Sequence, residues 1–175
     1  GGRAFVDCAT LAFEVAPETP YGPLALTVRG GACARTVAAE QFQHVPAPNV
    51  TGLSQRTLCR AALNVVTLTG TAFVAAQQRT LLPRVVLDDG AGARVAATDV
   101  AVDGCTPVPQ DPAFELCTQL TFTINGAAFG KDSDSATLTV SNMDTETEEN
   151  SGGCGSTEVI AKMPIVGVPT VTDYE

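Results

Sequence analysis

The chain has 175 residues, a net charge of -9 and 45% hydrophobic residues, a size and composition typical of a folded domain rather than a disordered tail. It contains no tryptophan, two tyrosines and one histidine. Because its few basic residues form no cluster, we expect it to bind neither nucleic acid nor an anionic membrane surface. Its apolar stretches are short, so no membrane span is predicted, and no cofactor is expected.

Residues that favour strands dominate the chain, and clusters of Gly, Pro and Asp separate them. The predicted strands are residues 9–15, 24–29, 63–69, 84–87, 94–102, 119–125, 137–141 and 158–163. Leu120, Phe122 and Ile124 alternate with threonines, which is the period of a strand with one buried face. The pattern predicts an all-β, β-rich fold, an antiparallel β-sandwich.

One segment departs from the strand pattern. Ala38, Phe42 and Val45 fall at helical spacing, and Pro46 closes the stretch. We therefore predict one short helix near residues 35–45. Residues 53–63 and 73–82 also carry helical spacing, and for these both a helix and a strand stay open.

Six cysteines are spread along the chain without a Cys-x-x-Cys motif or a histidine cluster. This spacing disfavours a zinc site or a thioredoxin-like redox motif. Disulfide bonds in an oxidising compartment are the better explanation, so we expect a secreted, extracellular protein at the cell surface. The cysteines are Cys8, Cys33, Cys59, Cys105, Cys117 and Cys154.

An internal repeat organises these cysteines. Residues 8–15 match residues 117–124 in the pattern C-x-x-L-x-F-x-V/I, and Cys59 leads a looser copy. The repeat predicts three Cys-led units, residues 1–52, 53–111 and 112–163, within one domain that spans 1–163. With one bridge per unit, the suggested pairs among several possible connectivities are Cys8 with Cys33, Cys59 with Cys105 and Cys117 with Cys154.

Two sites of modification or binding are suggested by local motifs. Asn49-Val50-Thr51 is a glycosylation sequon in what the flanking Pro48 and Gly52 indicate is an exposed loop. Its alternative is an unmodified asparagine. Asp132 and Asp134 are weak candidates for calcium ligands, with a solvated acidic loop as the alternative.

The residues needed for catalysis are scarce. His44 is the single histidine, so any Ser-His-Asp or Cys-His arrangement would have to be built on it. Asp88, Asp89, Glu115 and Asp132 could act as carboxylate pairs, but most are better explained as turn and loop residues. We therefore expect no catalytic residue and no enzyme activity.

The C-terminal residues 164–175 form an apolar, strand-like tail. Pro164 and Pro169 suit an edge strand, because proline removes one donor from the ladder. The tail is expected to be the last strand of its own sheet, a strand that completes a neighbouring subunit, or a linker. The side chains that would act in assembly are Ile165, Val166, Val168 and Val171.

Residues 120–130, followed by 136–140, resemble the IPT/TIG class of immunoglobulin-like domains. In that class a strand runs into a Gly-x-x-Phe-Gly turn and another strand follows. Residues 67–73 and 84–87 are similar but lack the glycine after Phe73. The resemblance implies an Ig-like extracellular β-sandwich used for adhesion or as a spacer, with no catalytic residues. The six cysteines depart from the class.

Two functions fit these observations. The first is a non-catalytic structural or adhesive module, a subunit of a cell-surface filament, wall or extracellular matrix assembly. Its partners would be neighbouring copies joined by strand complementation, or other extracellular proteins. The alternative is an extracellular module that binds a carbohydrate or protein ligand through loops on a rigid sandwich.

Overall fold

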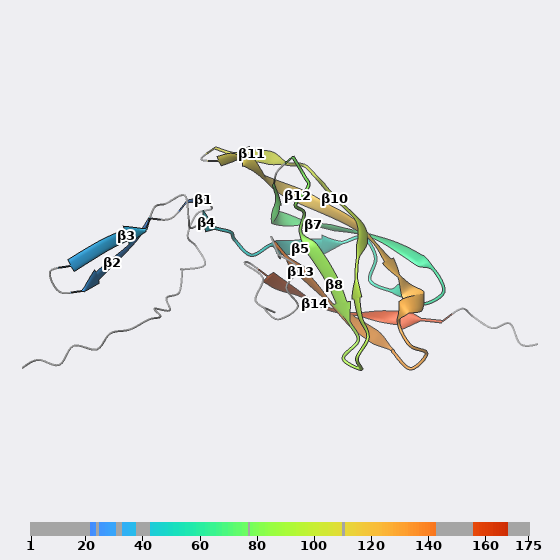
Figure 1. Cartoon of the computed structure of the whole chain (residues 1–175). Coiled ribbons are helices and arrows are strands. Elements are labelled where there is room, and N and C mark those ends of the chain that lie inside the picture. The colour runs from blue at the N-terminus through green and yellow to red at the C-terminus, as the bar shows by residue number, and fades with distance from the viewer. Residues whose placement is uncertain are drawn as a thin grey trace, which may run out of the picture.

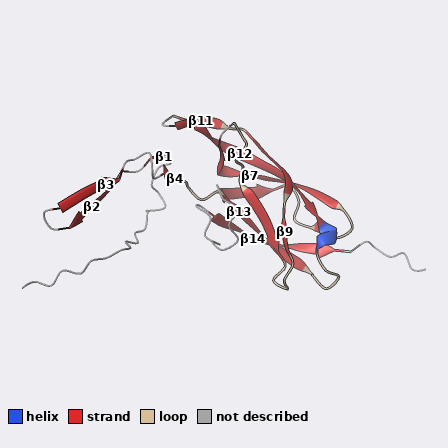
Figure 2. Cartoon of the chain, in the orientation of Figure 1, coloured by secondary structure: helices blue, strands red, loops and turns tan. Residues whose placement is uncertain are grey.

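The computed structural model describes residues 22–23, 25–30, 33–37, 43–76, 78–109, 111–142 and 156–167. Strands dominate these residues (Figure 2), and the larger sheets are almost entirely antiparallel. The predicted β-rich, antiparallel fold is therefore confirmed. Helical structure in the described residues is limited to one 3-10 turn, Gly126–Ala128.

Two five-stranded sheets form the main body of the molecule. The strands of the first are β5 (Asn49–Leu53), β7 (Leu63–Ala76), β10 (Thr98–Asp103), β11 (Thr106–Val108) and β12 (Asp111–Asn125). Their order is β10-β12-β7-β5, and β11 pairs with the start of β12. All pairs in this sheet are antiparallel.

The second sheet contains five strands that are spread along the sequence from residue 58 to residue 166. These are β6 (Leu58–Cys59), β8 (Arg84–Asp88), β9 (Arg94–Ala96), β13 (Ser135–Ser141) and β14 (Ser156–Val166). Their order is β6-β14-β13-β8-β9, and only the short β6–β14 pair is parallel. We call residues 45–167 the two-sheet body.

Two further strand pairs precede the two-sheet body (Figure 1). Strand β1 (Gly22–Pro23) pairs with β4 (Gln43–His44), and β2 (Leu26–Gly30) pairs with β3 (Cys33–Val37). Figure 1 shows the β2–β3 hairpin apart from the two-sheet body.

The core lies between the two large sheets, because each sheet contributes its inward side chains to a single cluster. On β12 the predicted alternation is confirmed, with Leu120, Phe122 and Ile124 all buried. On β7, Val66 and Leu68 are buried in the same way. The second sheet contributes Val85, Leu87, Ala136, Leu138, Val140 and Met163. Burial of this apolar area is the main stabilising contribution to the body.

The glycines that begin the two Gly-x-x-Phe segments, 70–73 and 126–129, are explained by close backbone contacts. A Cβ atom on Gly70 would lie 2.1 Å from the carbonyl oxygen of Asn49, and one on Gly126 would lie 2.1 Å from that of Cys59. Each position therefore requires glycine so that a neighbouring chain segment can approach.

Two buried asparagines satisfy backbone groups at opposite ends of the body. The Asn142 side chain accepts from the Val74 N–H at 3.0 Å and donates to the carbonyls of Ala72 and Pro46 at 2.7 and 2.9 Å. Asn64 accepts from the Cys59 N–H at 2.8 Å and donates to the same residue's carbonyl at 3.0 Å. Both side chains substitute for strand pairing where the ladder ends.

The predicted helix near 35–45 is wrong where the structure describes this segment, and residues 38–42 lie outside the described residues. Residues 33–37 form β3 and residues 43–44 form β4, because cross-strand pairing with β2 and β1 overrides a short helical pattern. Residues 73–82 are likewise a strand to Ala76 and then a turn. The predicted strand 9–15 lies outside the described residues, and the prediction for 94–102 is divided between β9 and β10.

We expect Asn142→Ala to lower the free energy of unfolding by about 2–3 kcal/mol, because it leaves the buried Val74 N–H without a partner. Urea denaturation measures this change. Gln119→Ala, on the exposed face of β12, is the control and should change stability by less than about 0.5 kcal/mol. An equally small effect of Asn142→Ala would contradict the assigned role.

Candidate functional site

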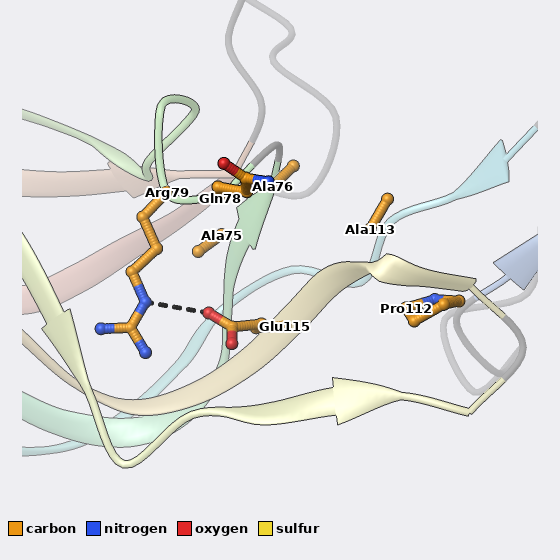
Figure 3. A pocket seen from close by; sticks show the side chains of 7 residues that line it. All are labelled: Ala75, Ala76, Gln78, Arg79, Pro112, Ala113 and Glu115. Carbon is orange, nitrogen blue, oxygen red and sulfur yellow. Dashed lines mark hydrogen bonds and ion pairs between the residues drawn. The ribbon is translucent and has the colours of Figure 1, made fainter.

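A pocket of about 680 Å³ opens where the end of β7 meets the start of β12. Figure 3 shows Arg79 directed toward Glu115 across the pocket, with Ala75 and Ala76 at the end of β7 beside them. The lining residues are Ala75, Ala76, Gln78, Arg79, Pro112, Ala113 and Glu115. The pocket therefore combines a small apolar surface with an amide, a guanidinium and a carboxylate.

A tight turn after β7 positions the Gln78 and Arg79 side chains. Gln78 and Arg79 both have positive φ values, 58° and 67°, and paired backbone bonds between Ala76 and Leu81 close the hairpin at 2.9 and 3.2 Å. Such φ values are unfavourable for residues with long side chains. The turn thus holds Arg79 over the pocket at a conformational cost.

An ion pair crosses the pocket. The Arg79 Nε–H donates to Glu115 Oε2 at 2.9 Å, and the two side chains are 50% and 30% exposed. At such exposure an ion pair contributes little to stability. Its main effect is to orient the guanidinium, whose terminal N–H groups can still donate to a ligand.

A disulfide lies next to this site. Cys105 and Cys117 are bridged, and the Glu115 carboxylate lies within 4.8 Å of both sulfur atoms. These three residues are the single metal-compatible cluster within the described ranges. Because both sulfurs are in the bridge, they provide no thiolate ligands for a metal.

The bridge corrects the predicted pairing. Cys59 with Cys105 and Cys117 with Cys154 are both wrong, since Cys105 pairs with Cys117 and Cys59 is free and exposed. The reason is that β11 folds back on β12, which brings Cys105 beside β12. The bridge crosses the boundary between units 53–111 and 112–163, so one bridge per unit is also wrong. The side chains of Cys8, Cys33 and Cys154 lie outside the described residues.

A second polar cluster joins three loops at the opposite end of the body. The Asp89 carboxylate accepts hydrogen bonds from the Ser133 hydroxyl and from the backbone N–H groups of Ala91 and Ala93. Arg60 donates to the carbonyl oxygens of Gly130 and Ser133. We call this group the loop clamp. Because these polar atoms are already hydrogen-bonded to one another, we do not assign the loop clamp as a ligand-binding site.

The loop clamp lowers one pKa. The Ser133 hydroxyl, followed by the Ala91 N–H, stabilises the charged carboxylate and holds the pKa of Asp89 below its ordinary value of 3.8. The candidate calcium ligands Asp132 and Asp134 lie in the adjoining loop and are exposed. Neither belongs to a metal-compatible cluster in the part of the chain that the structure describes.

The other candidate residues lie apart from the pocket. Asn49 is exposed, but it begins edge strand β5 rather than lying in a loop. His44 lies in β4. Ile165 is buried in the chain's own second sheet, where it aligns with Leu58, while Val166 is 44% exposed. Val168 and Val171 lie outside the described residues.

Sequence reasoning identified Glu115 as a carboxylate but missed its pairing with Arg79. The two residues are 36 positions apart, and only the β7–β12 register brings them together. The tight turn between Ala76 and Leu81 was also not predicted, because it contains none of the usual Asn-Gly or Asp-Gly signals.

The fold and the pocket define a disulfide-bonded, two-sheet β protein. Comparison of the chain with protein-family models, curated proteins and solved structures finds no match. The described residues include no helix with the length and apolar character that a membrane crossing requires.

We expect the double variant Cys105→Ala/Cys117→Ala to lose about 3 kcal/mol of unfolding free energy, the value for closing a loop of this size. Urea denaturation of the oxidised proteins provides the measurement. Cys59→Ala is the matched control and should change stability little, because its side chain is exposed. Equal losses from both variants would contradict the assigned bridge.

We expect Asp89→Asn to destabilise the protein near neutral pH. Since the folded pKa is depressed, the carboxylate's contribution is present above the unfolded pKa and is lost as pH falls through the lower folded value. Denaturation curves from pH 7 to pH 2 should therefore converge with the wild type only below about pH 4. Asp132→Asn, which removes the same charge from an exposed position in the neighbouring loop, is the control and should change stability little. A pH-independent loss for Asp89→Asn would contradict the interpretation.

Proposed function

We propose that the protein is a non-catalytic, extracellular structural or adhesive module with an Ig-like β-sandwich, which acts as a spacer within a larger surface assembly. The observation that carries this proposal is the arrangement of the body's two connections. The chain enters and leaves the two-sheet body at opposite ends (Figure 1), as a unit that transmits tension along its length would require.

Hydrogen bonds define the two ends. The entering segment is held at the Pro46 carbonyl by Asn142, which follows the last residue of β13. The leaving segment is held by the Ile165 N–H, which donates to the Asp134 carbonyl just before β13 begins. The seven residues of β13 thus separate the two connections by about 23 Å.

Two other features support an extracellular location. The Cys105–Cys117 bridge is of a kind that persists in oxidising compartments. Asn49 and Thr51 of the sequon are both exposed, so a glycan on Asn49 would extend into solvent without disturbing the core. Both features suit a durable protein on a cell surface.

Force spectroscopy on the whole chain, held at residues 1 and 175, tests the spacer proposal. We expect a discrete unfolding event for the two-sheet body. Reduction of Cys105–Cys117 should lengthen the released contour by about 40 Å, because twelve more residues become extensible. Gradual extension without a force peak would contradict a load-bearing role.

A second candidate function is supported by the Arg79–Glu115 pocket. Guanidinium, amide and carboxylate groups beside apolar Ala and Pro surface suit a polyhydroxylated ligand such as a carbohydrate. The pocket lacks an aromatic stacking platform among its lining residues, so we place this function second.

A glycan array tests the binding function. If a carbohydrate binds in the pocket, Arg79→Ala and Glu115→Ala should each weaken binding at least tenfold, through lost charge-assisted hydrogen bonds. Arg94→Ala, an exposed arginine on β9, is the matched control. The absence of any bound glycan would favour the spacer.

A further inference from the structure

We propose that Cys105 is a thiol-exchange site, at which the Cys105–Cys117 bridge opens to form a mixed disulfide with a small cationic aminothiol. The Glu115 carboxylate selects that class of thiol against anionic ones. The inference goes beyond the proposed function and holds for a spacer and for a binding module alike.

The two cysteines of the bridge differ in access. Cys117 is completely buried in the hydrophobic core, whereas Cys105 is only partly buried and packs against the core from its margin. Cys105 follows the turn at Gly104, whose φ is 63°, and lies between β10 and β11. Thiol–disulfide exchange begins when an external thiolate reaches one of the two sulfurs. The attack therefore falls on the Cys105 sulfur.

The exchange replaces one disulfide bond by another. A thiolate attacks the Cys105 Sγ, a new S–S bond forms to that atom, and the bond between the two cysteine sulfurs breaks. The electron pair leaves on the Cys117 Sγ, which is reduced and takes a proton from water, while the attacking thiol is oxidised to the mixed disulfide. The reverse step restores the bridge and releases the thiol.

A carboxylate lies beside both sulfurs. A Glu115 oxygen is within 4.8 Å of each Sγ atom. During exchange the departing negative charge forms on Cys117, where burial withholds solvation. A carboxylate at this distance opposes the approach of an anionic thiol and attracts one that carries an ammonium group. The charge of Glu115 thus sets which thiols open the bridge.

Arg79 moderates this selection. Its Nε–H donates to Glu115 Oε2 at 2.9 Å, so the guanidinium offsets part of the field of the carboxylate. Both side chains are partly exposed, and water screens such a pair. The net charge of -9 also favours cationic thiols, but charges more than about 10 Å away are largely screened at 0.1 M salt. Glu115 is therefore the charge to vary.

Thiol exchange on the folded, full-length chain tests the proposal. The oxidised protein is incubated with cationic cysteamine or anionic mercaptopropionate, quenched with acid and mapped by mass spectrometry. Each rate is divided by the rate of the same thiol with a small neutral disulfide, which removes differences in nucleophilicity. We expect the adduct on Cys105, with Cys117 as the free thiol. The cationic-to-anionic rate ratio should fall about fivefold in Glu115→Gln.

Two further variants complete the test. Asp132→Asn removes the same charge from the exposed loop that adjoins the loop clamp, and should change the ratio by less than about twofold. Arg79→Gln should raise the ratio, because it leaves the Glu115 charge without its partner. A purely structural role for Glu115 changes both rates alike and leaves their ratio constant, which overturns the proposal. So does an adduct found mainly on Cys117, or the absence of an adduct from both sulfurs.

Discussion

The antiparallel pairing of β7 with β12 is the constraint on which the rest of the structure depends. It extends from Leu63–Asn125 at one end to Ala76–Phe114 at the other, and its inner side chains form the centre of the core. A register shift beside Cys117, opposite Ala72 with its positive φ of 61°, re-aims the ends of both strands. That shift places Arg79 and Glu115 across one pocket. The site is therefore a consequence of how the two longest strands are paired.

The ends of this strand pair are stabilised by different means. At the pocket end a disulfide and a strained turn fix the geometry, while at the opposite end Asn64 and the loop clamp use hydrogen bonds alone. Both ends of the two-sheet body are thus stabilised, and the chain enters at one end and leaves at the other. This arrangement suits a unit that is linked in series with others.

The sequence predicted those features that depend on local pattern. The alternation of Leu120, Phe122 and Ile124 was sufficient to place a strand and its buried face. It was insufficient to pair Cys105 with Cys117, because that requires knowing that β11 turns back on β12. The helix expected near 35–45 failed for a related reason, since cross-strand partners outweigh a short periodic pattern. The Arg79–Glu115 pair depends on register, which a single sequence does not encode in any short motif.

Native-state hydrogen exchange across the described strands tests the central role of the β7–β12 pair most directly. The amides of residues 65–68 and 121–124 should exchange only through global unfolding, with an opening free energy equal to that from urea denaturation. Residues 26–29 should exchange far faster in the same experiment. Exchange of the β7–β12 amides by local opening, at a free energy well below that of β13, would contradict the account.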